Sequence, residues 1–201
     1  MQPEARENVV GNFYDKYGTK NPIARALMHG FLSAVSDLYR RAAPLRVLEV
    51  GCGEGRLAHH LITTCPAPEA FEACDLSIER VAPDLDPRIR FRQASIYELP
   101  FADRSFDLVL CCEVLEHLED PERGLAEVAR VTSQHALLST PREPLWRALN
   151  MLRGKYLTNL GNTPGHVQHW SAHGLTRLVE RELRVLERRQ PLPWTVLLAQ
   201  V

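Results

Sequence analysis

The sequence predicts a doubly wound, Rossmann-like α/β fold: a mostly parallel sheet of seven strands, one of them antiparallel near the C-terminus, with helices on both faces. Short apolar stretches alternate with helical stretches, which implies parallel strands joined by right-handed crossovers. Asp107–Cys111 is almost purely apolar, as expected of a strand covered on both faces. Two further strands meet at the turn Pro191–Pro193, and so direct a connection requires antiparallel pairing.

The elements follow from local signals. Residues 22–42 carry apolar side chains at helical spacing, with Pro22 suited to the start of the helix. Ser77 is a plausible N-cap for a helix beginning at Ser77–Val81, and Pro121 suits a first helical turn. We expect strands at Arg46–Val50, Phe71–Cys74, Ile89–Gln93, Asp107–Cys111, His135–Ser139, Leu183–Arg189 and Trp194–Val201, and further helices at Arg56–Thr64, Pro121–Val131 and Leu145–Leu152.

Composition narrows the class of protein. A chain of 201 residues suits one domain, which we divide into an N-terminal arm and helix over residues 1–44 and a main domain over 45–201. A net charge of −1 gives no reason to expect bulk nucleic-acid binding. The five cysteines are odd in number and irregularly spaced, so no disulfide framework is indicated. Without a signal-peptide pattern or a membrane-spanning apolar run, we expect a cytoplasmic protein, either monomer or homodimer.

Residues 141–170 interrupt the alternation of strands and helices. Long irregular insertions are usually functional loops, and this one follows a strand's carboxyl end, where open α/β sheets bind ligands. We expect this lid and the N-terminal arm to form a pocket for a small molecule. The candidate pocket residues are Tyr14, Tyr17, Trp146, Tyr156 and His169, although each could instead pack the lid or lie at the surface. Arg142, Arg147, Arg153 and Lys155 make the lid positive, which suits an anionic ligand or a solvated face.

A glycine-rich loop follows the first strand, in the run Glu49-Val50-Gly51-Cys52-Gly53-Glu54-Gly55. The sixth position from Gly51 is Arg56, so the dinucleotide pattern G-x-G-x-x-G fails. The flanking carboxylates would repel a pyrophosphate, but they suit a ligand that carries an ammonium and a sulfonium group. Asp75, at the end of the second strand, can accept hydrogen bonds from both hydroxyls of a ribose.

These residues resemble the first motif and the second-strand acid of class I S-adenosylmethionine-dependent methyltransferases. Ala94-Ser95-Ile96 before Leu99-Pro100-Phe101 is similar to the adenine-side motif, and the resemblance covers roughly residues 45–140. Ser95 stands where the family often has Asp, so the adenine contact falls to a weaker group or to the backbone. The resemblance implies S-adenosylmethionine as cofactor, S-adenosylhomocysteine as product, and a donor site comprising Glu49, Gly51, Cys52, Gly53, Gly55, Asp75, Leu76, Ser95, Ile96 and Cys112.

A second group of polar residues follows the fourth strand. Glu113, Glu116 and His117 are spaced i, i+3 and i+4, so one helical turn would place them on one face. Such a face can bind a divalent cation. Alternatively, the carboxylates face solvent or bond the loop, His117 bonds nearby backbone groups, or His117 acts as a general base without metal.

Both the ubiquinone-biosynthesis O-methyltransferases and the small-RNA 2′-O-methyltransferases carry E-x-x-E-H and a later histidine. This resemblance implies a metal site, for Mg²⁺ or Zn²⁺, at Glu113, Glu116, His117 and His166, with Glu113, His117 and His166 as catalytic candidates.

We therefore expect O-methylation of a small hydroxylated molecule, such as a quinol or catechol, a sugar or a secondary metabolite. N- or C-methylation and methylation of an RNA 3′ end are alternatives within the same enzyme class. An alternative of another class is a non-catalytic subunit that binds the methyl donor. A dehydrogenase is the remaining structural analogue, and binding of a nicotinamide dinucleotide would distinguish it.

Overall fold

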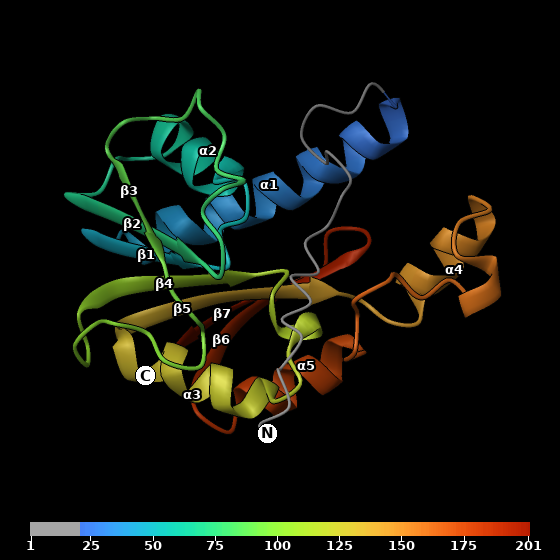
Figure 1. The fold of residues 1–201 in the computed structure, drawn as a ribbon. Helices are drawn as coiled ribbons and strands as arrows, with labels where there is room; N and C mark the ends of the chain where they lie inside the picture. Colours follow the sequence, from blue (N-terminus) through green and yellow to red (C-terminus); the bar gives the residue numbers. More distant parts are fainter. Residues whose placement is uncertain (1–20) are drawn as a thin grey trace, which may run out of the picture.

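The computed structural model describes residues 21–201, and Figure 1 shows their arrangement. Seven strands form one sheet in the order β3-β2-β1-β4-β5-β7-β6. Their bounds are β1 Arg46–Val50, β2 Ala70–Asp75, β3 Ile89–Gln93, β4 Phe106–Cys112, β5 Thr132–Pro141, β6 Arg184–Arg189 and β7 Trp194–Gln200. β7 pairs antiparallel with both of its neighbours, and the other pairings are parallel. The predicted fold class is confirmed.

Helices cover both faces of the sheet, with α1 and α2 on one side and α3 and α5 on the other (Figure 1). The helices are α1 Pro22–Ala42, α2 Arg56–Thr64, α3 Pro121–Val131, α4 Leu145–Leu152 and α5 Ala172–Val179, with short 3₁₀ turns at Leu115–His117 and Leu157–Asn159. In β4, Leu108 and Leu110 pack into the core under α1 and α2, whereas Val109 and Cys111 pack into the core under α3 and α5. Burial on both faces explains why this strand reads as an uninterrupted apolar run.

The helix predicted to begin at Ser77 is wrong, because residues 76–88 form bends and turns between β2 and β3. Pro83 and Pro87 explain the difference: each lacks a backbone N–H and disfavours helical backbone in the residue before it. Side chains satisfy part of this backbone instead, since the Ser77 hydroxyl accepts from the Glu79 N–H at 3.4 Å. The N–H of Ala82 donates to the Glu54 carbonyl at 3.1 Å, so the segment is attached to the glycine loop.

The order of the strands fixes where a ligand can bind. From β1 the chain proceeds outward to β2 and β3, then returns to β4 on the other side of β1. Ligands of open α/β sheets bind beyond the carboxyl ends of the strands where this reversal occurs. β1 leads into the glycine loop and β4 into residues 113–117, so both polar groups singled out in the sequence flank this position.

The insertion between β5 and α5 is anchored at its two ends. Arg142 and Trp170 form a β-bridge, and the N–H of Glu143 donates to the Trp170 carbonyl at 2.9 Å. Between these points the chain forms α4, which projects away from the sheet in Figure 1. Tyr14 and Tyr17, the other expected pocket residues, lie outside the described residues.

Candidate active site

The loop after β1 turns sharply at three glycines, whose φ angles are 73° at Gly51, 53° at Gly53 and 74° at Gly55. Positive φ is costly for residues with a Cβ, which explains the glycines. The N–H groups of Gly51 and Cys52 both donate to the Cys74 carbonyl, at 2.8 and 3.0 Å. These bonds hold the loop against the end of β2.

The three glycines differ in what surrounds them. A Cβ on Gly51 would lie 2.3 Å from Cγ2 of Val114, and one on Gly55 would lie 2.6 Å from Leu85. A Cβ on Gly53 would meet no atom of residues 21–201 within 4 Å. Gly51 and Gly55 are therefore required by packing within the protein, whereas Gly53 borders open space where a ligand can approach the backbone.

Asp75 ends β2 beside this open space. Its Oδ2 accepts from the Gly53 N–H at 2.8 Å, and its Oδ1 accepts from the Ser77 N–H at 3.3 Å. Leu76 is the next residue, and its side chain is 52% exposed, which leaves apolar surface beside the carboxylate. Asp75 and Leu76 thus present a hydrogen-bond acceptor and an apolar contact at the same strand end.

Glu49 lies beneath the loop and is only 3% exposed. Burial raises the pKa of its carboxyl to about 8, opposed by a hydrogen bond from the Ala58 backbone and assisted by the charge of Asp75. Its Oε2 is buried and has no hydrogen-bond partner among the described residues. A buried carboxyl oxygen without a partner is costly, so this atom is suited to a cationic or hydrogen-bond-donating ligand.

The remaining candidate donor-site residues differ in how deeply their side chains are buried. Ser95 is half-buried, and its hydroxyl accepts from the Tyr97 N–H at 3.2 Å. Ile96 is buried in the core under α3, so its side chain is committed to packing. Cys52 is buried and Cys112 is half-buried at the end of β4; burial raises the pKa of both thiols well above the usual range. Both cysteines are therefore neutral groups at the base of the loop.

The structure brings Glu116, His117 and His166 together. One ligand atom from each lies within 4.8 Å of the others, although His166 is far along the chain. The insertion is joined to this position because the N–H groups of Val167 and Gln168 both donate to the Glu116 carbonyl, at 2.9 and 3.1 Å. Glu116 and His166 are 2% and 7% exposed, so the cluster is largely shielded from water.

The imidazole of His117 has a defined tautomer. Its Nδ1 lies 2.9 Å from the Gly165 carbonyl, and a carbonyl oxygen only accepts, so Nδ1 carries the proton. In the neutral ring, Nε2 is then the nitrogen with a lone pair. The rings of His117 and His166 meet edge to face, with centroids 5.0 Å apart. A histidine held through its other nitrogen by a backbone carbonyl is the usual arrangement for a metal ligand and also suits a general base.

Glu113 does not share a helical face with Glu116 and His117, and this part of the prediction is wrong. Glu113 has a φ of 61° and precedes the 3₁₀ turn at Leu115–His117. Its carboxylate accepts from Trp194 Nε1 at 2.7 Å and from the Ser139 hydroxyl at 3.1 Å. The positive φ directs the carboxylate toward β5 and β7, where it connects three strand ends.

The insertion supports His166 through contacts that the sequence did not indicate. Trp146, a candidate pocket residue, stacks on His166 at 6.1 Å between ring centroids and donates to the Thr163 hydroxyl at 2.9 Å. The buried Asn150 amide donates to the Gly161 carbonyl at 2.9 Å and to the Thr163 hydroxyl at 3.2 Å. No short motif marks Asn150 or Thr163, since their roles depend on contacts across the insertion.

The other two candidate pocket residues of the insertion are exposed. Ring nitrogen Nε2 of His169 is 2.7 Å from Oδ1 of Asn162, and His169 is exposed. Tyr156 is 38% exposed, in the 3₁₀ turn region beyond α4. His169 is not part of the group formed by Glu116, His117 and His166, which could hold a metal ion.

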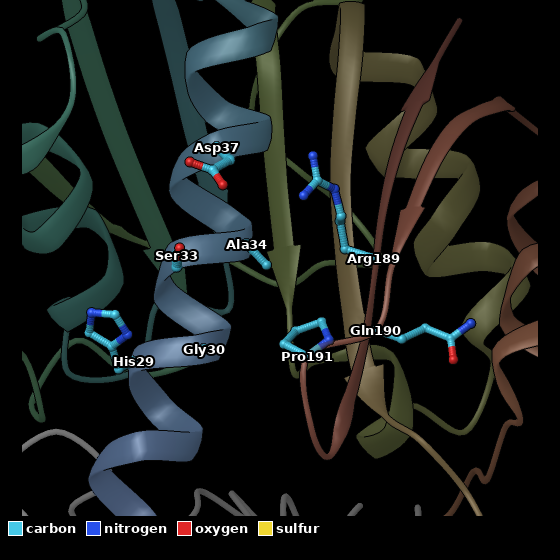
Figure 2. Close-up of a pocket in the computed structure, with 8 residues that line it drawn as sticks. All are labelled: His29, Gly30, Ser33, Ala34, Asp37, Arg189, Gln190 and Pro191. Atoms are coloured by element: carbon cyan, nitrogen blue, oxygen red, sulfur yellow. The ribbon is translucent and has the colours of Figure 1, made fainter.

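Figure 2 shows a separate hollow of about 320 Å³ between α1 and the turn joining β6 to β7. His29, Ser33 and Asp37 line it from α1, and Arg189, Gln190 and Pro191 line it from the turn. None of the candidate donor-site or metal-site residues lines this hollow. It is therefore distinct from the position at the carboxyl ends of β1 and β4.

Comparison with known proteins identifies the class. Residues 48–140 match the family described as a methyltransferase domain. This part of the chain belongs to that family, and it carries the glycine loop, Asp75 and the segment from Glu113 to His117. Among the residues that the structure describes, no helix is both long and apolar enough to cross a membrane.

Individual relatives are similar over part of their length. Demethylmenaquinone methyltransferase of Porphyromonas gingivalis is 31% identical over 153 residues, which are 68% of this chain and 58% of that protein. Ubiquinone biosynthesis O-methyltransferase of Alkalilimnicola ehrlichii is 31% identical over 122 residues, 57% of this chain and 49% of that protein. The chain thus spans about half the length of these curated relatives.

A solved structure agrees with the fold. Magnesium protoporphyrin IX methyltransferase of Synechocystis PCC 6803, determined with bound SAH, matches with a TM-score of 0.64 and 18% identity, covering 91% of this chain and 89% of that one. At this identity the likeness establishes the Rossmann-like methyltransferase fold and no more.

Proposed function

We propose that this protein binds S-adenosylmethionine and transfers its methyl group to a hydroxyl of a small molecule. The observation that carries the proposal is the combination of three features beyond β1 and β2. These features are the open side of Gly53, the carboxylate of Asp75 and the Glu49 oxygen that has no hydrogen-bond partner among the described residues. Together they suit a cationic nucleoside. A pyrophosphate would meet the Asp75 carboxylate there, and its negative charge would keep Glu49 in the neutral form.

Each residue has a role in holding the donor. Asp75 accepts from the ribose hydroxyls while the Gly53 N–H keeps its carboxylate in place. Glu49 faces the ammonium end, where a nearby positive charge favours its ionised form. Leu76 and the backbone of residues 95 and 96 cover the adenine. When bound, S-adenosylmethionine supplies a methyl group on a positively charged sulfur, which leaves as neutral S-adenosylhomocysteine.

His117 is the candidate general base. Its Nδ1 proton is held by the Gly165 carbonyl, so Nε2 can accept the proton that the acceptor hydroxyl loses as the new carbon–oxygen bond forms and the carbon–sulfur bond breaks. His166 and Trp146 shield this position. Alignment of the two reactants in such a shielded site would lower the barrier, by roughly 7–11 kcal/mol in the best intramolecular cases.

In a second version of this proposal, Glu116, His117 and His166 hold a divalent cation that assists methyl transfer. One carboxylate and two imidazoles within 4.8 Å suit Zn²⁺, which typically takes three protein ligands in catalytic sites and leaves a position open. A bound cation would lower the pKa of the acceptor hydroxyl. The contacts of Glu113 to Trp194 and Ser139 favour a structural role for Glu113 over that of a fourth ligand.

The names of the two relatives favour a quinone or quinol acceptor. Demethylmenaquinone methyltransferase and ubiquinone biosynthesis O-methyltransferase both refer to quinones. N- or C-methylation and an RNA 3′-terminal hydroxyl remain alternatives, as does a non-catalytic subunit that binds the donor. Any of these acceptors loses a proton on methylation, which the histidine pair can accept; the name of the second relative, an O-methyltransferase, favours oxygen among them.

The test is transfer of labelled methyl from S-adenosylmethionine to a panel of catechols, hydroquinones, sugars and a 3′-terminal RNA oligonucleotide, followed by mass spectrometry. Each reaction is run with added Mg²⁺, with added Zn²⁺ and with chelator. Labelled catechol or hydroquinone supports the proposal, and loss of labelling with chelator supports the metal form. Tight donor binding with no labelled acceptor in any arm supports the non-catalytic alternative.

A further inference from the structure

The tip of the insertion exposes several large apolar side chains that lie close together in the sequence. All residues from 151 to 160 are exposed. Half of them are large and apolar, with exposed fractions of 39% at Met151, 83% at Leu152, 38% at Tyr156, 59% at Leu157 and 65% at Leu160. Single exposed apolar residues need no explanation, but five within ten residues form a patch that marks an interaction site. We name residues 151–160 the insertion tip.

The insertion tip is built to hold these side chains outward. Tyr156 and Leu160 have φ angles of 54° and 50°, which are unfavourable for residues with a Cβ. Gly161 makes the turn back: its N–H donates to the Tyr156 carbonyl at 2.9 Å, and a Cβ there would lie 2.2 Å from the Arg147 carbonyl. Asn150 fixes the base of the tip from inside. The backbone is thus stabilised by its base while its apolar side chains face solvent.

The charged side chains of the segment around the insertion tip are all basic. Residues 144–165 contain Arg147, Arg153 and Lys155 and no aspartate or glutamate, although the whole chain has a net charge of −1. Arg153 and Lys155 stand among the exposed apolar residues of the tip. Interleaved apolar and basic residues on one projecting element are characteristic of segments that lie in the interface of an anionic bilayer.

We propose that the insertion tip docks the protein on an anionic lipid surface, with Leu152, Leu157 and Leu160 entering the acyl boundary and Arg153 and Lys155 near the headgroups. The tip projects from the body of the molecule (Figure 1), which suits a planar surface better than an element of a second protein. A second copy of this chain is disfavoured, because it would bring the same cations together.

A chain of contacts joins the insertion tip to the candidate active site. Asn150, at the base of the tip, bonds Thr163, which bonds the Trp146 ring that stacks on His166. A docked protein would thus hold its histidine cluster near the membrane, where apolar acceptors concentrate. Docking itself requires neither methyl transfer nor a bound donor, so it is tested separately from the proposed function.

The experiment is sedimentation of the full chain with phosphatidylcholine vesicles that contain one quarter phosphatidylglycerol, compared with pure phosphatidylcholine vesicles. We expect binding to the anionic vesicles that weakens at high salt, because screening reduces the contribution of the two cations. The double variant Leu152→Gln with Leu157→Gln should bind at least about tenfold more weakly, since two apolar side chains would no longer leave water for the acyl region.

Replacing Arg153 and Lys155 by Gln together should reduce the preference for anionic vesicles by at least about fivefold. The control is Leu45→Gln, whose side chain is 56% exposed at the opposite, amino end of β1. It should bind vesicles like the original protein.

The proposal is overturned if the protein binds neither kind of vesicle. It is also overturned if Leu45→Gln weakens vesicle binding as much as the tip variants do. A dimer in sedimentation velocity that the tip variants dissociate overturns it too, because the occupant would then be a second copy. Circular dichroism and S-adenosylhomocysteine binding, which the tip variants should retain, verify that these variants are folded.

Discussion

Substituting alanine at Gly53 and, separately, at Gly51 tests whether the open space beside the loop is the donor site. Both glycines have positive φ, which costs alanine about 1 kcal/mol. At Gly53 the added methyl meets no atom of the described part of the chain within 4 Å, so we expect no further loss in the free energy of unfolding. At Gly51 the methyl lies 2.3 Å from Val114, whose β-branched side chain has few alternative rotamers. Overpacking there adds about 1–3 kcal/mol.

The two variants should therefore separate stability from binding. We expect Gly53→Ala to lose only about 1 kcal/mol in the free energy of unfolding but to bind S-adenosylhomocysteine at least about tenfold more weakly, a loss of about 1.4 kcal/mol in binding. Gly51→Ala should be clearly less stable. Urea unfolding followed by circular dichroism gives the first quantity and titration calorimetry the second. Unchanged calorimetric affinity in Gly53→Ala would refute the placement of the donor against this backbone.

Three further predictions concern single side chains. Asp75→Ala should weaken S-adenosylhomocysteine binding at least about tenfold in calorimetry, because it removes the acceptor for the ribose hydroxyls; equal affinity would reject that assignment. His117→Ala should lose methyl transfer while donor affinity survives, and a fully active variant would exclude His117 from the mechanism. The pKa of Glu49 is raised to about 8, so the folded protein retains a proton that the unfolded chain loses above about pH 4.5. Stability should consequently fall as pH rises from about 5 to 8, by at most about 1.4 kcal/mol per pH unit. Glu49→Gln should flatten this slope in urea unfolding measured across that range, and an identical slope would show that burial does not hold the proton.

The sequence was most informative where one residue type satisfies a local physical requirement. The apolar run of β4 predicted burial on both faces, and alternate residues do enter the two cores. The turn at Pro191–Pro193 predicted the antiparallel strand β7. The glycine loop was also readable, because Gly51, Gly53 and Gly55 all have positive φ.

The sequence was less informative where the outcome depends on contacts between distant segments. Spacing alone suggested that Glu113 joins Glu116 and His117, but a single backbone angle of 61° turns its carboxylate toward Trp194. The helix predicted at Ser77 failed because two prolines outweigh one N-cap. The scaffold formed by Asn150 and Thr163 left no periodic signal, since it is made by two hydrogen bonds across the insertion.

Titration calorimetry of the full chain tests the central claim most directly, with S-adenosylhomocysteine in one titration and a nicotinamide dinucleotide in the other. A donor site at Glu49, Asp75 and the open side of Gly53 should bind the nucleoside at one site per chain and give no heat with the dinucleotide. Saturable binding of the dinucleotide, with no heat from S-adenosylhomocysteine, would contradict the account.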